Sequence, residues 1–412
     1  MRPGFGTRRC LQLALTANAL HPARSPVTAV PSFAAGWPVA ELAPHLLGLT
    51  VADTAVHLLR NGVRSPADRI GVAASALSVA GLGALIGTAR HAQDTVESAL
   101  IEALGPDYRQ ALTQRQDDEQ AVPWGRLARP FHHRDPEVRR DRDIAYAPGG
   151  KRFLLDVYRP RDGGSGMPVL LQVHGGAWMI GNKDQQGLPL MMRMARRGWT
   201  CVAINYPLSP AAHWPAHVIS VKRALAWIKD NIHTYGGDPG HVAVTGGSAG
   251  GHLAALLALT ANDPRLQPGF TEADTTVQAC VPHYGVYDFA ATSGSSASTA
   301  RLRHVLARYV VGKDPDEFRD DYVTTSPLDR ITDAAPPFFV VHGTHDTLIP
   351  VKEARHFVRQ LREQSREPVA YAEIPGAQHA FDIFTSIRST HVARGVARFL
   401  DHTHNAGVTE AG

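Results

Sequence analysis

The feature that most constrains the fold is a serine enclosed by glycines between a strand-like segment and a helix-like one. Residues 242–245 read Val-Ala-Val-Thr, residues 246–251 read Gly-Gly-Ser-Ala-Gly-Gly, and residues 253–259 are all apolar. A sharp reversal from strand into helix brings the positions two residues either side of the serine against neighbouring backbone, where only glycine fits. The G-x-S-x-G pattern therefore predicts that Ser248 stands at the start of a helix, in a nucleophile elbow. An ordinary glycine-rich turn with a capping serine is the alternative that these five residues alone leave open.

From about residue 143 onwards, strand-like and helix-like segments alternate along the chain. We expect strands over residues 152–158, 169–173, 200–205, 242–245, 278–283, 338–341 and 369–374. We expect helices over residues 215–234, 249–261, 299–311, 351–364 and 390–402. Continuous apolar runs such as residues 338–341 are typical of strands covered on both faces. The alternation predicts an α/β fold with a mostly parallel, doubly wound sheet, whose ligands bind at the carboxyl ends of the strands.

Paired glycines follow one of these expected strands. Residues 174–178 read His-Gly-Gly-Ala-Trp, directly after the strand over 169–173. Paired glycines let two backbone N–H groups point to one place, where they stabilise a developing oxyanion. We expect an oxyanion hole made by the N–H groups of Gly175, Gly176 and Ala249, with Trp178 beside the acyl part of a substrate. An ordinary glycine turn is the alternative.

The acid and the base that would act with Ser248 can be identified because each should lie just after an expected strand. In the chain order Ser…Asp/Glu…His, the base lies after the acid. Asp346 follows the strand over 338–341, whereas Asp288, the second candidate, follows an earlier strand. Of the histidines after Asp346, only His379 follows a strand. Because an imidazole must take the proton of a serine hydroxyl to make it nucleophilic, these positions predict a Ser248–His379–Asp346 triad.

Several motifs together resemble the hormone-sensitive-lipase-like branch of the α/β-hydrolases. These motifs are His174-Gly-Gly-Ala-Trp178, Asn205-Tyr-Pro-Leu-Ser-Pro210, Gly237-Asp-Pro239, Gly246-Gly-Ser-Ala-Gly250, the Asp346 loop and His379-Ala-Phe381. The likeness is closest to actinobacterial cell-envelope carboxylesterases with a long N-terminal extension, and it covers about residues 145–403. It implies an α/β-hydrolase fold, the triad named above, no metal or organic cofactor, and a small-molecule ester of a short- to medium-chain acid, cleaved through an acyl-serine intermediate.

Two positions depart from the pattern of that family. Ala177 stands where a third glycine is frequent, which bears on the size of the alcohol group that fits beside the ester. Gly247 stands where the family usually has an acidic residue before the nucleophile. We therefore expect a hydrogen bond behind Ser248 to be missing.

Two other function classes stay open at this point. An amidase, formamidase or N-deacetylase uses the same triad with a different leaving group, and a non-catalytic hydrolase-fold protein would bind without cleaving. The formal net charge of +4 over 412 residues gives no indication of nucleic-acid binding. The three cysteines form neither a disulfide framework nor a metal-ligand spacing.

The chain divides into three expected parts. We predict a helical extension over residues 1–120, a basic, proline-containing and solvated linker over 121–144, and a catalytic domain over 145–405. Residues 70–89 carry no charge, and this stretch is about as long as a membrane span. Within it, Gly83 and Gly87 have a spacing that permits close helix contact. Two interpretations remain: the extension contacts a membrane or cell envelope through residues 70–89, which we favour slightly over a cytoplasmic location, or its residues 37–115 cap the active site. No pattern indicates the oligomeric state.

Overall fold

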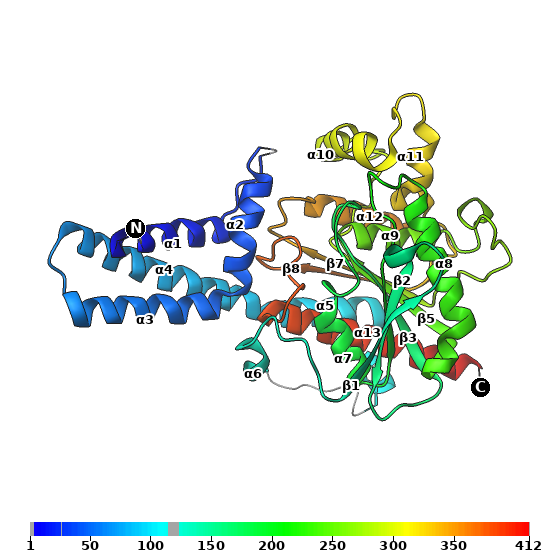
Figure 1. Ribbon diagram of the computed structural model, residues 1–412, viewed down its shortest axis with the longest axis horizontal. Coiled ribbons are helices and arrows are strands. Elements are labelled where there is room, and N and C mark those ends of the chain that lie inside the picture. The colour runs from blue at the N-terminus through cyan, green and yellow to red at the C-terminus, as the bar shows by residue number, and fades with distance from the viewer. Residues whose placement is uncertain (1–3, 26, 114–122, 412) are drawn as a thin grey trace.

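The chain forms an α/β domain from which a bundle of helices projects (Figure 1). The computed structural model describes residues 4–25, 27–113 and 123–411. The expected boundary between extension and linker, at residues 120 and 121, lies outside the described residues.

One mixed sheet organises the α/β domain. Its strands, as far as the structure is described, follow the order β1-β2-β4-β3-β5-β6-β7-β8. Their bounds are Val138–Ala145, Leu154–Pro160, Met167–Val173, Thr200–Ile204, Gly237–Gly247, Ala279–His283, Phe338–Gly343 and Val369–Ile374 for β1 to β8. β2 pairs antiparallel with β1 and β4, whereas β3 to β8 run parallel. The predicted mostly parallel α/β-hydrolase sheet is confirmed.

Helices cover both faces of this sheet (Figure 1). One hydrophobic core lies under α8 (Ala216–Asn231), α9 (Ala249–Leu259) and α12 (Val351–Gln364). The other lies under α5 (Ala92–Leu104), α7 (Leu188–Arg196) and α13 (Ile387–Ala411). The predicted N-terminal helical region is present, but α5 belongs to this second layer, so the part that stands apart from the sheet ends before α5.

Shorter helices occupy the connections between these elements. The α-helices are α6 (Trp124–Leu127), α10 (Ser296–Arg301) and α11 (Arg319–Thr325), and a π-helix, Leu302–Val311, continues α10. The 3-10 turns are Tyr108–Ala111, Gly150–Phe153, Ile232–Tyr235, Pro264–Leu266 and Pro327–Arg330.

The charged segment before residue 145 is not the solvated connector that we expected. Its residues 138–145 form the edge strand β1. The Arg140 Nε donates to Asp156 at 3.0 Å, and the Arg159 Nε donates to Asp141 at 2.9 Å. Charged side chains are common on edge strands, where they discourage pairing with other chains. The charge that suggested a linker therefore belongs to ion pairs between two neighbouring strands.

The projecting bundle consists of α1 (Phe5–Leu20), α3 (Ala43–Asn61) and α4 (Pro66–Arg90), and α2 (Ala29–Glu41) lies at its junction with the domain (Figure 1). α1 packs closely on α4 at glycines: a Cβ on Gly71 would lie 2.5 Å from Phe5, and one on Gly81 would lie 2.7 Å from Thr16. A Cβ on Gly83 or Gly87 would meet nothing within 4 Å. The close helix contact that the spacing of Gly83 and Gly87 permits is therefore not made among the described residues, because these two glycines face away from the neighbouring helices.

A buried ion pair fixes α2 to the catalytic domain. The Arg388 Nη1 lies 2.9 Å from Glu41 Oε1, and the Ser386 hydroxyl donates to Glu41 Oε2 at 2.7 Å. The Arg388 side chain is 0% exposed and that of Glu41 is 1% exposed. A second bond, 2.9 Å from the Thr347 hydroxyl to the Ala29 carbonyl, joins α2 to the loop after β7.

Glu41→Ala should destabilise the protein by about 3–5 kcal/mol, because it leaves the buried Arg388 guanidinium without its carboxylate. Equilibrium urea denaturation measures this change. Asp333→Ala removes an exposed pair with Arg366 and should cost less than about 1 kcal/mol. Equal effects of the two substitutions would contradict the account of this junction.

Candidate active site

Ser248 stands at a strained turn between β5 and α9. Its φ of 57° and ψ of −121° lie in a region that residues other than glycine rarely adopt. A Cβ on Gly246 would lie 2.6 Å from the Val173 carbonyl oxygen, and one on Gly250 would lie 2.1 Å from the same atom. Both glycines are therefore required for β5 and α9 to pack beside β3, and the predicted nucleophile elbow is present.

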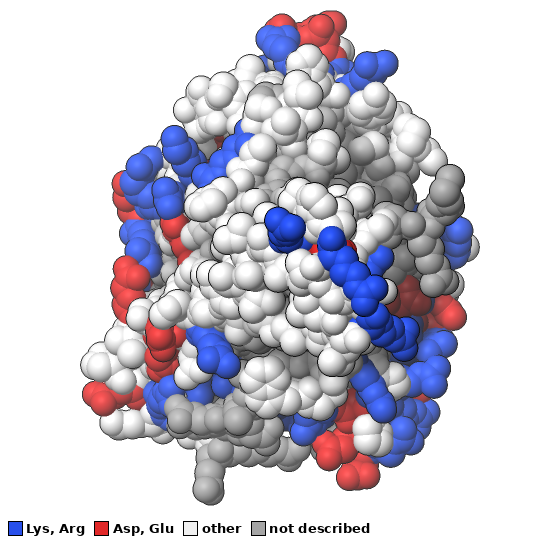
Figure 2. Space-filling view, turned by 90° about the vertical axis from the view of Figure 1, so that its left-hand side faces the viewer, with Lys and Arg blue, Asp and Glu red and all other residues white. Residues whose placement is uncertain are grey.

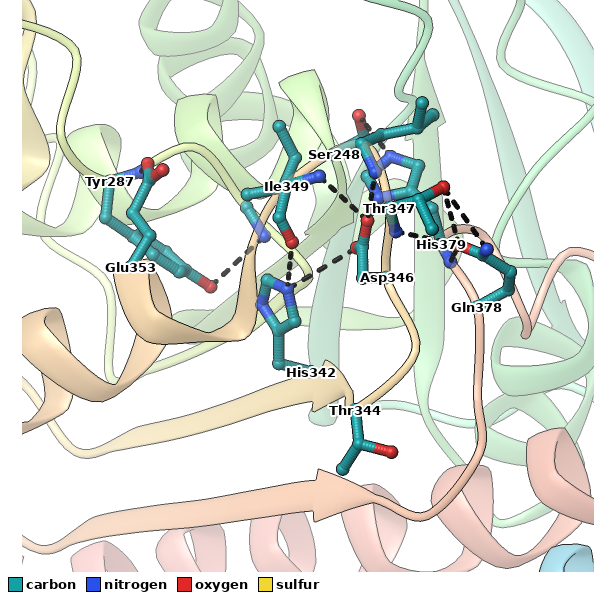
Figure 3. Close-up of polar contacts among 12 residues, drawn as sticks. Ser248, Tyr287, His342, Thr344, Asp346, Thr347, Ile349, Glu353, Gln378 and His379 are labelled. Atoms are coloured by element: carbon teal, nitrogen blue, oxygen red, sulfur yellow. Dashed lines mark hydrogen bonds and ion pairs between the residues drawn. The ribbon is translucent and has the colours of Figure 1, made fainter. Parts of the chain in front are cut away.

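The structure brings Ser248, His379 and Asp346 together (Figure 3). His379 Nε2 lies 2.9 Å from Ser248 Oγ, and His379 Nδ1 lies 2.6 Å from Asp346 Oδ2. The three residues follow β5, β8 and β7, so they meet at the carboxyl edge of the sheet, where such sites are expected. Asp288 is placed elsewhere: its carboxylate accepts from the Thr292 N–H at 2.8 Å.

The carboxylate of Asp346 is fixed on both oxygens. Oδ1 accepts from the N–H groups of Leu348, at 2.9 Å, and Ile349, at 2.8 Å. Oδ2 faces His379 and lies 3.4 Å from His342 Nε2. Burial raises the pKa of Asp346, but the two imidazoles outweigh it and hold that pKa well below its ordinary value. The ionised carboxylate can therefore orient His379 and stabilise its protonated form.

Gln378 joins the two loops that carry the acid and the base (Figure 3). Its Oε1 accepts from the Thr347 N–H and from the His379 N–H, each at 3.0 Å. The loop after β7 and the loop after β8 thus share one buried acceptor, which holds Asp346 and His379 in a fixed position relative to each other.

The glycine loop after β3 lies against the elbow but differs from the expected oxyanion hole. The Gly175 N–H already donates to Gln186 Oε1 at 2.7 Å, so the prediction of Gly175 as an oxyanion donor is wrong. Gly175 serves close packing instead, since a Cβ there would lie 3.2 Å from the Ser248 Cβ. Among the described residues, the N–H groups of Gly176, Ala177 and Ala249 donate to no acceptor.

Trp178 does not line the site as predicted. Its side chain is 3% exposed, and its indole N–H donates to His252 Nδ1 at 3.2 Å. Its ring also packs edge-on against Phe289, with 5.5 Å between centroids. The positive φ of Trp178, 60°, turns the indole into the hydrophobic core under α9, so the predicted role in substrate binding is wrong.

Two other aromatic rings contact His379, and sequence reasoning missed both. Tyr284 lies 4.7 Å from the imidazole and Phe33 of α2 lies 6.0 Å from it, measured between ring centroids. Tyr284 directly follows β6, so the same rule that found His379 could have found it. Phe33 precedes His379 by more than 300 residues, and no local pattern links the two.

Tyr284 also explains the glycine before the nucleophile. A Cβ on Gly247 would lie 2.7 Å from the Tyr284 hydroxyl, so an acidic side chain does not fit there. The Tyr284 hydroxyl bonds to Asp382, whose other oxygen lies 2.7 Å from His283 Nδ1. A carboxylate is therefore present behind the elbow, but it comes from a residue just after His379.

The described residues contain no group of three or more His, Cys, Asp or Glu side chains that could hold a metal ion. Of the three free cysteines, Cys201 and Cys280 are buried and Cys10 is exposed.

Comparison with known proteins gives the same fold and chemistry. The BD-FAE family model matches residues 155–361. The probable carboxylic ester hydrolase LipM of Mycobacterium tuberculosis is 44% identical over 377 residues, covering 88% of this chain and 83% of that protein. The esterase LipQ of the same organism is 45% identical over 320 residues, covering 76% and 75%.

Solved structures support the fold. Esterase B from Lactobacillus rhamnosis has a TM-score of 0.56 at 16% identity, covering 78% of this chain and 98% of that chain. A truncated carbohydrate esterase from gut microbiota has a TM-score of 0.53 at 22% identity, covering 64% and 96%. With the elbow, the sheet order and the two mycobacterial relatives taken together, the chain belongs to the BD-FAE family of α/β-hydrolases and is a serine carboxylesterase.

Proposed function

We propose that Ser248, His379 and Asp346 are the nucleophile, base and acid of this esterase. The 2.9 Å contact between His379 Nε2 and Ser248 Oγ is the observation that carries the proposal. His379 takes the hydroxyl proton as Ser248 Oγ attacks the ester carbonyl, and it then gives the proton to the leaving alcohol. Water, activated by the same imidazole, hydrolyses the acyl-serine. Asp346 holds the ring with Nε2 directed at the serine.

The oxyanion of the tetrahedral intermediate requires N–H donors beside Ser248. We propose the backbone N–H groups of Ala249, at the N-terminus of α9, and of Gly176 and Ala177 in the glycine loop. Among the described residues none of these groups has a hydrogen-bond acceptor, whereas the N–H of Gly175 donates to Gln186. Donors that are free before the reaction need no rearrangement when charge develops on the carbonyl oxygen.

The substrate side of the site is aromatic. Phe33 and Tyr284 both contact the His379 ring, and we propose that Phe33 forms a wall for the acyl chain. An apolar wall favours an acyl group over a sugar or a charged group. This supports short- to medium-chain carboxylic esters as the substrate class.

The expectation of membrane contact through residues 70–89 has support in helix length and composition. The helical stretch Pro66–Leu104, which includes α4, contains an 18-residue window with a mean hydropathy of 1.9, and 33% of that window is buried. We propose that this helix places the enzyme at a membrane or the cell envelope.

Ser248→Ala should lower kcat/KM for a p-nitrophenyl ester by about a thousandfold or more, because no other group can form the acyl intermediate. Steady-state hydrolysis measures the rate, and circular dichroism checks the fold. Ser165→Ala, in an exposed loop, is the matched control. Hydrolysis by Ser248→Ala at the rate of the control would refute the assignment.

Phe33→Ala should shift the preference towards longer acyl chains, because it removes the aromatic wall beside His379. We expect the ratio of kcat/KM for octanoate to that for butyrate to rise about tenfold. Phe318→Ala removes an exposed ring near α11 and should leave the ratio unchanged. An unchanged ratio in Phe33→Ala would show that α2 does not line the acyl site.

A further inference from the structure

The bundle surface is apolar where a water-soluble helix would be charged. Nine large apolar side chains are exposed on α1, α3, α4 and the turn between α3 and α4, namely Leu11, Leu49, Val51, Val56, Leu58, Leu59, Val63, Ile70 and Leu77. α3 buries only Ala43 and Thr50 of its 19 residues. Viewed end-on, the bundle is mostly uncharged at its centre, with Lys and Arg side chains over and around it (Figure 2). Exposed apolar surface of this extent marks an interaction site.

We propose that α1, α3 and α4 insert together into a lipid bilayer, with the turn between α3 and α4 on the far side. The proposal deepens the membrane contact proposed above and does not depend on the roles of the triad. At 1.5 Å per residue, α3 is roughly 28 Å long and the uncharged stretch of α4 roughly 30 Å, which matches a hydrocarbon core of about 30 Å.

Hydroxyl groups inside the bundle form hydrogen bonds within it, as a bilayer demands. The hydroxyls of Thr50 and Ser78 each donate to the carbonyl four residues earlier, at 2.7 Å. The Thr54 hydroxyl lies 2.9 Å from Ser75 Oγ on the facing helix. Hydrogen bonds of this kind, together with glycines at helix contacts such as Gly71, are typical of membrane helices.

Charged groups within the bundle are paired with one another. Asp53 pairs with Arg8 at 2.9 Å and with Arg9 at 3.3 Å. His57 lies 2.9 Å from Asp68, whose carboxylate caps the first turn of α4. Charges within a membrane segment are tolerated when they pair with one another or lie near a helix end.

The arginines give the inserted bundle a direction. Exposed Arg60, Arg64 and Arg69 surround the turn between α3 and α4. Arg8 and Arg9, in the N-terminal half of α1, lie beside Asp53 in the half of the bundle nearer this turn. At the other end of the helices, the described residues of α1 to α4 and their connections carry two arginines, Arg24 and Arg90. Because basic residues stay on the cytoplasmic side, this asymmetry places the turn in the cytoplasm and the catalytic domain outside.

Aromatic side chains lie where the membrane boundary would then fall. Phe33 and Trp37 of α2 stack at 5.7 Å, Trp37 contacts Phe384 at 5.5 Å, and Phe384 contacts the exposed Phe131 at 4.9 Å. Aromatic residues concentrate at membrane–water boundaries. Since Phe33 also contacts His379, the site lies beside this boundary, and esters dissolved in the lipid are the substrates within its reach.

Cysteine labelling in intact bacterial cells tests the proposal. Arg64→Cys and Asp162→Cys are made separately in full-length Cys10→Ser protein, where the remaining cysteines are buried. Asp162 is exposed on the catalytic domain and is the control position. With a membrane-impermeant maleimide, Asp162→Cys should label in intact cells, and Arg64→Cys should label only after the membrane is permeabilised.

Every other pattern overturns the proposal. Labelling of both positions in intact cells would mean that the turn does not cross the bilayer. Labelling of both only after permeabilisation would place the whole chain on the cytoplasmic side, and the opposite pattern would reverse the orientation. Hydrolysis of a water-soluble ester by each variant, measured in parallel, shows whether the esterase is intact, so a failure of insertion is distinguishable from a failure of the proposed function.

Discussion

The chain of hydrogen bonds from Asp346 through His379 to Ser248 depends on three loops that meet at one edge of a parallel sheet. Backbone geometry holds the elbow and the Asp346 loop, and the Gln378 side chain joins the His379 loop to the Asp346 loop. The elbow requires Gly246 and Gly250 against the Val173 carbonyl, and Asp346 is held by two N–H groups of its own loop. A serine hydroxyl becomes reactive only within this arrangement, because its proton must have an oriented acceptor.

The helical extension belongs to the same arrangement rather than being an appendage. α2 is joined to the catalytic domain by the buried Glu41–Arg388 pair and by the bond from Thr347 to Ala29, and it places Phe33 against His379. The expectation of either a membrane anchor or a cap treats these as competing roles of the same helices. In the structure these helices have two different positions: α2 lies beside the active-site loops, whereas α1, α3 and α4 project away from the sheet (Figure 1).

Sequence patterns predicted the parallel sheet and the convergence of the triad because both follow from local rules. Apolar runs mark buried strands, and a residue just after a strand lies at the carboxyl edge. Contacts between distant segments were not predictable in this way. The charged residues of β1 form ion pairs with β2, so their sequence resembles a solvated linker rather than an edge strand. Gln186 Oε1 accepts the hydrogen bond of the Gly175 N–H, which the motif alone assigned to the oxyanion. The inward turn of Trp178 likewise depends on His252 and Phe289, which no spacing reveals.

The central claim is that Ser248 is activated by its neighbours, and covalent labelling tests it most directly. The native protein is treated with a fluorophosphonate, which reacts with activated serines whatever their natural substrate, and the modified peptide is identified by mass spectrometry. The account predicts modification at Ser248 in the native protein and its loss when His379 is replaced by alanine. Modification at another serine, or undiminished labelling without the imidazole, would contradict it.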